Sequence, residues 1–170
     1  TSILLQNTMR VLDTAALLHW PVERCRGGIV AISQQEELLR VDEQRSMLME
    51  SASLDWRMPV ESALVRARGI ASETGDLPRL SMVDLDVLAL AIDLKITLVT
   101  DDYRMKNVAR KANIPVEGVL TTGGKKQWKW ILRCIGCRAE EDVPPNAKQS
   151  KKDDVQLCDR CGSPMKLKRR

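Results

Sequence analysis

The chain has 170 residues, of which 44% are hydrophobic and 29% are charged, a composition that is typical of a folded protein and excludes a wholly disordered one. It has no apolar stretch near the ~20 residues that cross a bilayer, and its first residues lack the pattern of a signal peptide, so we expect a cytoplasmic protein without membrane contact. The net charge of +4 is unevenly distributed: residues 1–120 carry 14 Lys and Arg against 17 Asp and Glu, whereas residues 121–170 carry 13 against 6, which favours a polyanionic partner.

Short apolar runs alternate with segments of helical periodicity along the first 120 residues. We expect Ser33 to cap one helix, and Ser81 with Asp84 to form a capping box at the start of another. In chain order the pattern predicts a strand at 9–12, a helix at 14–18, a strand at 28–32, a helix at 34–50, a strand at 54–58, a helix at 60–71, a helix at 82–95, a strand at 96–100, a helix at 102–112 and a strand at 116–120.

This order of elements predicts the fold class and the division into domains. Strands that alternate with helices across short connections require crossover packing, so residues 1–120 are expected to form an α/β fold, a three-layer α/β/α sandwich with a mostly parallel sheet. A basic linker is expected at 121–130 and a small C-terminal module at 131–170. Within that module we expect a polar loop at 138–156 and a flexible basic tail at 166–170.

Four of the five cysteines form two Cys-x-x-Cys pairs. Cys134 and Cys137 are separated from Cys158 and Cys161 by 20 residues, a spacing typical of a zinc ribbon. The alternatives are redox thiols or cysteines that only pack. Four thiolates leave no open coordination position, so one structural Zn²⁺ is expected rather than a catalytic one. We expect Cys25 to be a small packing residue rather than a nucleophile.

Acidic residues follow predicted strands or begin predicted helices. Asp13, Asp84 and Asp102 lie at such positions, and Glu37 falls in the expected first turn of a helix. Residues just after parallel strands collect at the carboxyl edge of the sheet, where these carboxylates would repel one another unless Mg²⁺ or Mn²⁺ offset their charge. The alternative is that each one only caps a helix. His19 is the one histidine in the sequence, and we expect it to be structural.

These acids also carry a family resemblance. The segments VLDTAAL, SQQEELLR, LSMVDLDVLALA and LVTDDYRMKNVA resemble the acidic quartet of PIN-domain ribonucleases. The similarity continues through WRMPVESALVRARGIASETGDLPRLS into the zinc ribbon, an order similar to that of the NIN-one-binding endonuclease family, in its archaeal form. That family matures the 3′ end of small-subunit rRNA.

The resemblance implies a PIN sandwich with a rubredoxin-like ribbon, and endoribonuclease cleavage that depends on one or two Mn²⁺ or Mg²⁺ ions. It implies a precursor small-subunit rRNA within a pre-ribosomal particle as substrate, and products with a 3′-hydroxyl and a 5′-phosphate. Asp86 and Asp101 are candidate outer ligands, and Glu36 is an alternative to its neighbour Glu37. The implied catalytic residues are Asp13, Glu37, Asp84 and Asp102, and the implied metal ligands are Asp13, Asp84 and Asp102.

The expected linker interleaves lysine and tryptophan. Lys125, Lys126 and Lys129 can neutralise phosphates, while Trp128 and Trp130 can stack unpaired bases, a combination typical of single-stranded RNA binding. The alternative is that a tryptophan packs the ribbon onto the first domain.

Two functions remain open at this point. One is a metal-dependent endoribonuclease whose ribbon binds rRNA. The other is a noncatalytic RNA-binding or ribosome-assembly module in which the acids are only caps and solvated charge. The intact acidic quartet favours the enzyme. The fused ribbon suggests a fixed, structured RNA target, which makes a toxin-like ribonuclease the less favoured kind of enzyme.

Overall fold

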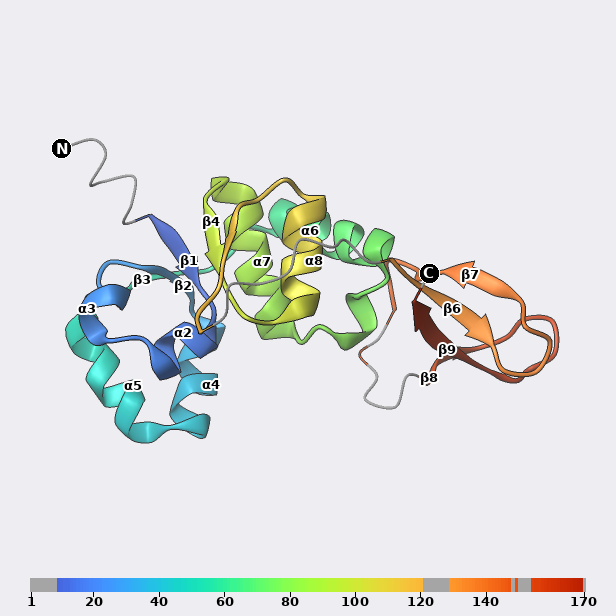
Figure 1. The fold of residues 1–170 in the computed structure, drawn as a ribbon, viewed down its shortest axis with the longest axis horizontal. Helices are drawn as coiled ribbons and strands as arrows, with labels where there is room; N and C mark the ends of the chain where they lie inside the picture. The colour runs from blue at the N-terminus through green and yellow to red at the C-terminus, as the bar shows by residue number, and fades with distance from the viewer. Residues whose placement is uncertain (1–8, 121–128, 148, 150–153, 170) are drawn as a thin grey trace.

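The structure, a computed structural model, describes residues 9–120, 129–147, 149 and 154–169. Two sheets organise these residues: one of five strands in the order β3-β2-β1-β4-β5, and one of four strands in the order β7-β6-β9-β8. Figure 1 shows the first sheet and its helices at one end of an elongated molecule and the second sheet at the other end. Among the described residues, no helix combines the length and the apolar character that a bilayer crossing requires.

Every strand pair in the first sheet is parallel, as the sequence predicts. The strands are β1 (Arg10–Leu12), β2 (Ile29–Ala31), β3 (Asp55–Arg57), β4 (Thr97–Val99) and β5 (Val116–Glu117). Because adjacent strands are parallel, the residues that follow them lie along the same carboxyl edge of the sheet.

Helices cover both faces of this sheet, which confirms the expected three-layer sandwich. Val11 and Leu98 pack toward one layer, whereas Leu12 and Val99, their neighbours in sequence, pack toward the other, as the twofold alternation of a strand requires. The first layer contains α6 (Glu61–Thr74), α7 (Met82–Leu94), α8 (Tyr103–Lys111) and the 3₁₀ turn η2 (Leu77–Arg79). The second contains α2 (Thr14–His19), α3 (Val22–Cys25), α4 (Ser33–Val41), α5 (Glu43–Met49) and the 3₁₀ turn η1 (Glu50–Ala52).

Two local expectations are wrong in this second layer. The single helix expected at 34–50 is divided at Asp42, whose carboxylate accepts a hydrogen bond from the Arg45 backbone N–H at 3.0 Å and so caps α5. Ser33 does not cap α4 but is its first residue, and its hydroxyl donates to Asp86 Oδ2 at 2.7 Å. By contrast, the capping box of Ser81 and Asp84 at the start of α7 is confirmed.

The second sheet is antiparallel and contains residues that were expected to be irregular. Its strands are β6 (Trp130–Cys134), β7 (Glu140–Asp142), β8 (Asp154–Leu157) and β9 (Pro164–Arg169). The expected loop at 138–156 therefore contributes β7 and most of β8. The expected flexible tail is also wrong up to Arg169, because Met165 and Leu167 are buried while β9 pairs with β6 along its length.

The small sheet packs against the first helical layer instead of standing apart from it. Leu132 and Val143 belong to the same buried cluster as Leu77 and Leu80, and Trp130 packs against that cluster. The Ser72 hydroxyl of α6 donates to the Val143 carbonyl. The two parts thus share one continuous core. Trp130 packs the small sheet onto the first domain, which was the alternative to a role in base stacking.

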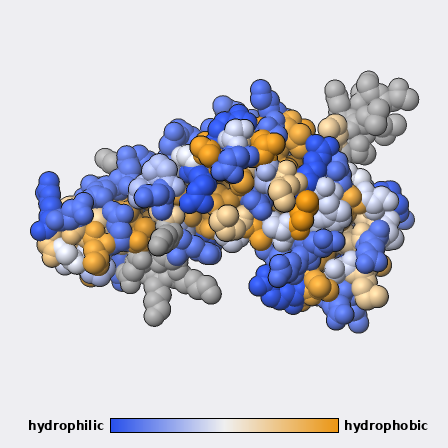
Figure 2. All heavy atoms as spheres, turned by 180° about the vertical axis from the view of Figure 1, so that it is seen from behind, coloured by the Kyte–Doolittle hydropathy of each residue, from blue (hydrophilic) through white to orange (hydrophobic). Residues whose placement is uncertain are grey.

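Gly75 explains how closely the two parts approach each other. It ends α6 with φ of +82°, a left-handed conformation that glycine adopts without a steric penalty. A Cβ placed at this position would overlap the Trp130 carbonyl oxygen, so the backbone of β6 rests directly on the end of α6. On the outer surface, exposed apolar side chains are interspersed with hydrophilic ones, as Figure 2 shows for one face.

Candidate active site

Asp13 stands at the carboxyl edge of the sheet, directly after β1, and its side chain is almost buried, with 8% exposed. Its Oδ1 accepts the Thr14 backbone N–H at 2.8 Å, and its Oδ2 accepts the Thr100 hydroxyl at 2.7 Å. Burial above all, together with the negative charges of Asp84 and Asp102, raises the pKa of Asp13 from its ordinary value to about 7, although the hydrogen bonds from Thr100 and Thr14 lower it. The structure thus places three of the expected acids within electrostatic reach of one another.

Thr100 connects the first of these acids to the last. Its side chain is fully buried, and the hydroxyl that donates to Asp13 also accepts the Asp102 backbone N–H at 3.0 Å. Asp102 caps α8, because its Oδ1 accepts the Arg104 N–H at 2.8 Å. Sequence reasoning missed Thr100, although its place between a β-branched strand and two aspartates was a usable signal.

Asp84 and Glu37 complete the group from α7 and α4. Burial raises the pKa of Asp84, and the charges of Asp102 and Glu37 raise it further, which brings all four expected acids into one electrostatic cluster. Glu36 lies in the first turn of α4 and is exposed, whereas Glu37 lies just beyond that turn and is half-buried. The expected helix register was therefore slightly wrong, and Glu37 faces the cluster more closely than its neighbour does.

The donor set of this cluster fits a hard divalent cation. Carboxylate oxygens are the ligands that Mg²⁺ prefers, and a cation would offset the repulsion and the burial that raise the pKa of Asp13. Within the described ranges, the carboxylates form no group of three whose ligand atoms all lie within 4.8 Å of one another. Mg²⁺ usually keeps several waters and binds one or two carboxylates together with substrate phosphates, so it does not require three carboxylates in direct contact.

The four cysteines expected to bind zinc converge on one point. Their sulfur atoms all lie within 4.8 Å of one another, with 3.3 Å between Cys134 and Cys161 and 3.7 Å between Cys137 and Cys158. Tetrahedral Zn²⁺ with Zn–S bonds of about 2.3 Å needs sulfurs about 3.8 Å apart. The backbone N–H groups of Gly136 and Cys137 point at Cys134 Sγ, at 3.3 and 3.4 Å. The site has the ligands and the geometry of a structural zinc centre.

Comparison with known proteins shows the family of the chain. A family model described as the PIN domain of ribonuclease matches residues 11–94. The endoribonuclease Nob1 of Pyrococcus abyssi is 37% identical over 131 residues, which cover 74% of this chain and 75% of that protein. The Nob1 of Methanocaldococcus jannaschii is 32% identical over 169 residues, covering 94% and 77%. The chain belongs to the Nob1 family of PIN-domain endoribonucleases.

Membership of the Nob1 family confirms the resemblance, the fold class and the enzymatic activity that the sequence implied. A relative with another name, ribonuclease VapC1 of Thermoplasma acidophilum, is 42% identical over 160 residues, which cover 92% of this chain and 76% of that protein. Both names denote ribonucleases. The protein is therefore an endoribonuclease, and PIN nucleases of this kind use divalent metals.

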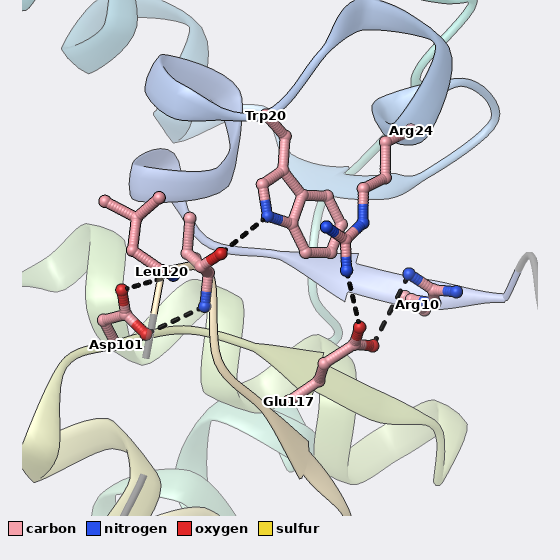
Figure 3. Close-up of polar contacts among 7 residues, drawn as sticks. Arg10, Trp20, Arg24, Asp101, Glu117 and Leu120 are labelled. Carbon is pink, nitrogen blue, oxygen red and sulfur yellow. Dashed lines mark hydrogen bonds and ion pairs between the residues drawn. The ribbon is translucent and has the colours of Figure 1, made fainter. Parts of the chain in front are cut away.

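Asp101 belongs to a different contact network from its neighbour Asp102. Its two carboxylate oxygens accept the backbone N–H groups of Val119 and Leu120 at 2.8 and 2.9 Å. The Trp20 indole N–H donates to the Val119 carbonyl from the opposite side at 3.0 Å, as Figure 3 shows. Asp101 thus holds the segment that follows β5, and its role as an outer metal ligand stays a prediction. Asp86, the other candidate outer ligand, accepts the hydroxyl of Ser33.

An ion-pair cluster lies on the other side of the Trp20 ring. The Arg24 guanidinium stacks over that ring at 3.9 Å, and Glu117 binds both Arg24 and Arg10, at 3.1 and 3.5 Å (Figure 3). These contacts join α3 and β1 to β5 at the place where the chain leaves the first sheet. They are stabilising contacts of the scaffold rather than part of the acidic cluster.

Two further buried polar residues were missed by the sequence analysis. Gln34 is fully buried, and its side chain donates to the Leu12 carbonyl at 2.9 Å and accepts the Ala31 N–H at 2.7 Å, which joins the ends of β1 and β2 beside the acids. Asp76 is buried and accepts a hydrogen bond from Asn107 at 2.6 Å. Burial raises the pKa of Asp76 to about 6. Neither residue stands in a pattern that marks it before the fold is known.

Part of the expected RNA-binding segment can be placed. Lys125, Lys126 and Trp128 lie outside the described residues. Lys129 forms an ion pair with Asp142 at 3.2 Å, and the Trp130 ring lies 5.3 Å from the guanidinium carbon of Arg79.

The other two residues considered in the sequence analysis lie away from the acids. His19 is exposed at the end of α2. Cys25 is buried, and its thiol lies 3.6 Å from the Ala16 carbonyl, so it packs in the core as expected.

Proposed function

We propose that the protein cleaves the precursor of small-subunit rRNA at its 3′ end, in a reaction that depends on Mn²⁺ or Mg²⁺ and leaves a 3′-hydroxyl and a 5′-phosphate. The observation that carries the proposal is the cluster of four acids at the carboxyl edge of the sheet, in a chain whose relatives are named endoribonuclease Nob1. A noncatalytic module is not favoured, because the acids stand on four different helices or helix caps, α2, α4, α7 and α8, and still lie within electrostatic reach of one another.

In this proposal Asp13, Asp84 and Asp102 hold one or two ions, and Glu37 completes the ring. When bound, Mn²⁺ or Mg²⁺ would neutralise charge on the scissile phosphate and acidify the attacking water. The water oxygen forms a bond to phosphorus while the bond from phosphorus to the 3′ oxygen breaks, and the 3′ oxygen leaves with a proton. Because water is the nucleophile, the 2′-hydroxyl takes no part. Thr100 acts as a positioning residue, since its hydroxyl bonds both Asp13 and the Asp102 backbone.

The four cysteines hold a structural Zn²⁺ in this proposal, and the basic residues of the C-terminal part bind rRNA within a pre-ribosomal particle. The excess of Lys and Arg over residues 121–170 supports this assignment, because cations that contact phosphates release condensed counterions. Replacing Lys125, Lys126 and Lys129 with Ala is expected to weaken binding and to flatten its dependence on salt, by roughly one unit of slope for each of these lysines that binds a phosphate. We place this activity in the cytoplasm, where free thiols such as those that bind zinc persist.

The test is incubation of the purified protein with a precursor rRNA 3′ segment, in Mn²⁺ or in EDTA, followed by analysis of the product ends. Asp84→Asn keeps the side-chain volume but removes the charge, so it is expected to abolish cleavage and to spare RNA binding. Asp93→Asn is the matched control, because Asp93 lies near the other end of α7, where it pairs with Arg66 at 3.7 Å. Cleavage that persists in EDTA, or a 2′,3′-cyclic phosphate product, contradicts the mechanism.

A further inference from the structure

A cavity of about 410 Å³ adjoins the acidic cluster on the side of the small sheet. Its lining comes from three elements: η2, the start of α8 and the start of β6. Asp102 is part of the lining, so any occupant of the cavity lies beside a candidate metal ligand. The lining residues are Arg79, Asp102, Tyr103, Arg104 and Trp130.

The chemistry of this lining matches a nucleotide. Arg79 and Arg104 bring two guanidinium groups, which bind phosphate oxygens through paired N–H donors. Tyr103 is 41% exposed, and Trp130 is half-buried with the Arg79 guanidinium 5.3 Å from its ring, so a base would stack on the ring surface that the core and Arg79 leave uncovered. Asp102 is the one carboxylate among these lining residues, and Asp76 also lies within electrostatic reach of Arg104.

The walls of the cavity are held in place by contacts on both sides. The hydrogen bond from Asn107 to Asp76 ties α8 to the residue that precedes η2. On the other side, the backbone of Trp130 rests on Gly75, where the chain has no room for a side chain. The three lining elements therefore belong to one packed unit, so the cavity is formed before a ligand arrives.

We propose that this cavity binds one unpaired nucleotide of the RNA substrate, next to the phosphate that is cleaved; the proposal rests on the function proposed above. A volume of about 410 Å³ is in the range of small-ligand pockets, roughly 300–1,000 Å³, and holds a single nucleotide but not a duplex. Stacking is tolerant of sequence, because every base has a π-face. The cavity thus selects single-stranded RNA at the cleavage position.

The experiment measures the Kd of a short single-stranded RNA that spans the precursor cleavage site, with an abasic nucleotide placed at each position in turn. Binding is measured without added Mn²⁺ or Mg²⁺ and without a chelator, so that the RNA is not cleaved and the zinc site of the small sheet is left intact. For the unchanged protein we expect one position at which loss of the base weakens binding roughly 5- to 100-fold, the range of single stacking contacts. Intact RNA is expected to bind more weakly to two variants, Trp130→Leu and Arg104→Gln. Trp130→Leu keeps an apolar side chain against the core. The penalty at that abasic position should shrink in Trp130→Leu.

Arg110→Gln is the matched control, because it removes the same charge from the last turn of α8. It is expected to keep the full abasic penalty. The proposal is overturned if no position shows a penalty, if Trp130→Leu keeps the whole penalty, or if Arg104→Gln and Arg110→Gln weaken binding equally. An abasic penalty without cleavage of the precursor would refute the proposed function alone, whereas cleavage without a penalty would refute the nucleotide site alone.

Discussion

Replacing Asp101 and Asp102 with Asn, one at a time, is expected to separate stability from cleavage although the two residues are adjacent. Each oxygen of Asp101 accepts one backbone N–H, at 2.8 and 2.9 Å. Asn keeps one acceptor oxygen and presents an NH₂ group to the second N–H, so one charge-assisted hydrogen bond is removed. Such a bond contributes about 1.5–3 kcal/mol. Because Leu120 is exposed, we expect the free energy of unfolding to fall by about 2 kcal/mol, near the low end.

Asp102→Asn is expected to leave the stability nearly unchanged and to abolish cleavage. Asn is as effective as Asp at a helix N-cap, and Asn keeps an oxygen for the Arg104 N–H, so the free energy of unfolding should change by less than about 1 kcal/mol. Cleavage should fall to background, because the charge that would hold the cation is removed while the shape is kept.

Urea unfolding followed by circular dichroism measures the first quantity, and initial rates on a precursor rRNA segment in Mn²⁺ measure the second. Rates are compared at a temperature at which both variants are folded. If Asp101→Asn abolished cleavage at unchanged stability, Asp101 would belong to the metal site. If Asp102→Asn cleaved normally, the assignment of the acidic cluster would be wrong.

Three further predictions concern stability. Cys134→Ser, or removal of zinc with a chelator, should unfold the small sheet while the amide spectrum of the parallel sheet persists, because zinc binding supplies much of the folding free energy of such a module; an unchanged spectrum of the small sheet would contradict the zinc site. Gly75→Ala should lower the melting temperature and shift the fluorescence of Trp130. The left-handed backbone costs alanine about 1–2 kcal/mol, and the new Cβ overlaps the Trp130 carbonyl. Gly69→Ala, in the open middle of α6, is the control and should be neutral or stabilising. The pKa of the Asp76 carboxyl group is raised to about 6, so the folded protein holds the proton of that group more tightly than the unfolded chain does. The free energy of unfolding should therefore fall by up to about 3 kcal/mol as the pH rises from about 4 to about 6. Asp76→Asn should remove this part of the pH dependence, which unfolding curves across the same range would measure.

The local pattern of the sequence was enough to predict most of the parallel sandwich. Hydrophobic residues that recur every two positions in a strand, or every 3.6 positions in a helix, indicate which face of the element is buried. This pattern can be read from residues that are only a few positions apart. The capping box at Ser81 and the cysteine knuckles are also local, so both could be predicted before the fold was known. The expected convergence of Asp13 and Asp102 required one more step, the rule that parallel strands share a carboxyl edge.

The remaining features depend on contacts between residues far apart in the chain. Thr100 bonds Asp13 across 87 residues, and Asp101 bonds Val119 because β1, β4 and β5 are neighbours in the sheet. The sequence by itself thus determined which side chains are buried within each element and which acids follow the strands. The tertiary structure decided that Asp101 bonds the segment after β5 and how the small sheet meets α6, because a hydrogen bond depends on distances that are set only when the sheet order and the shared core are complete.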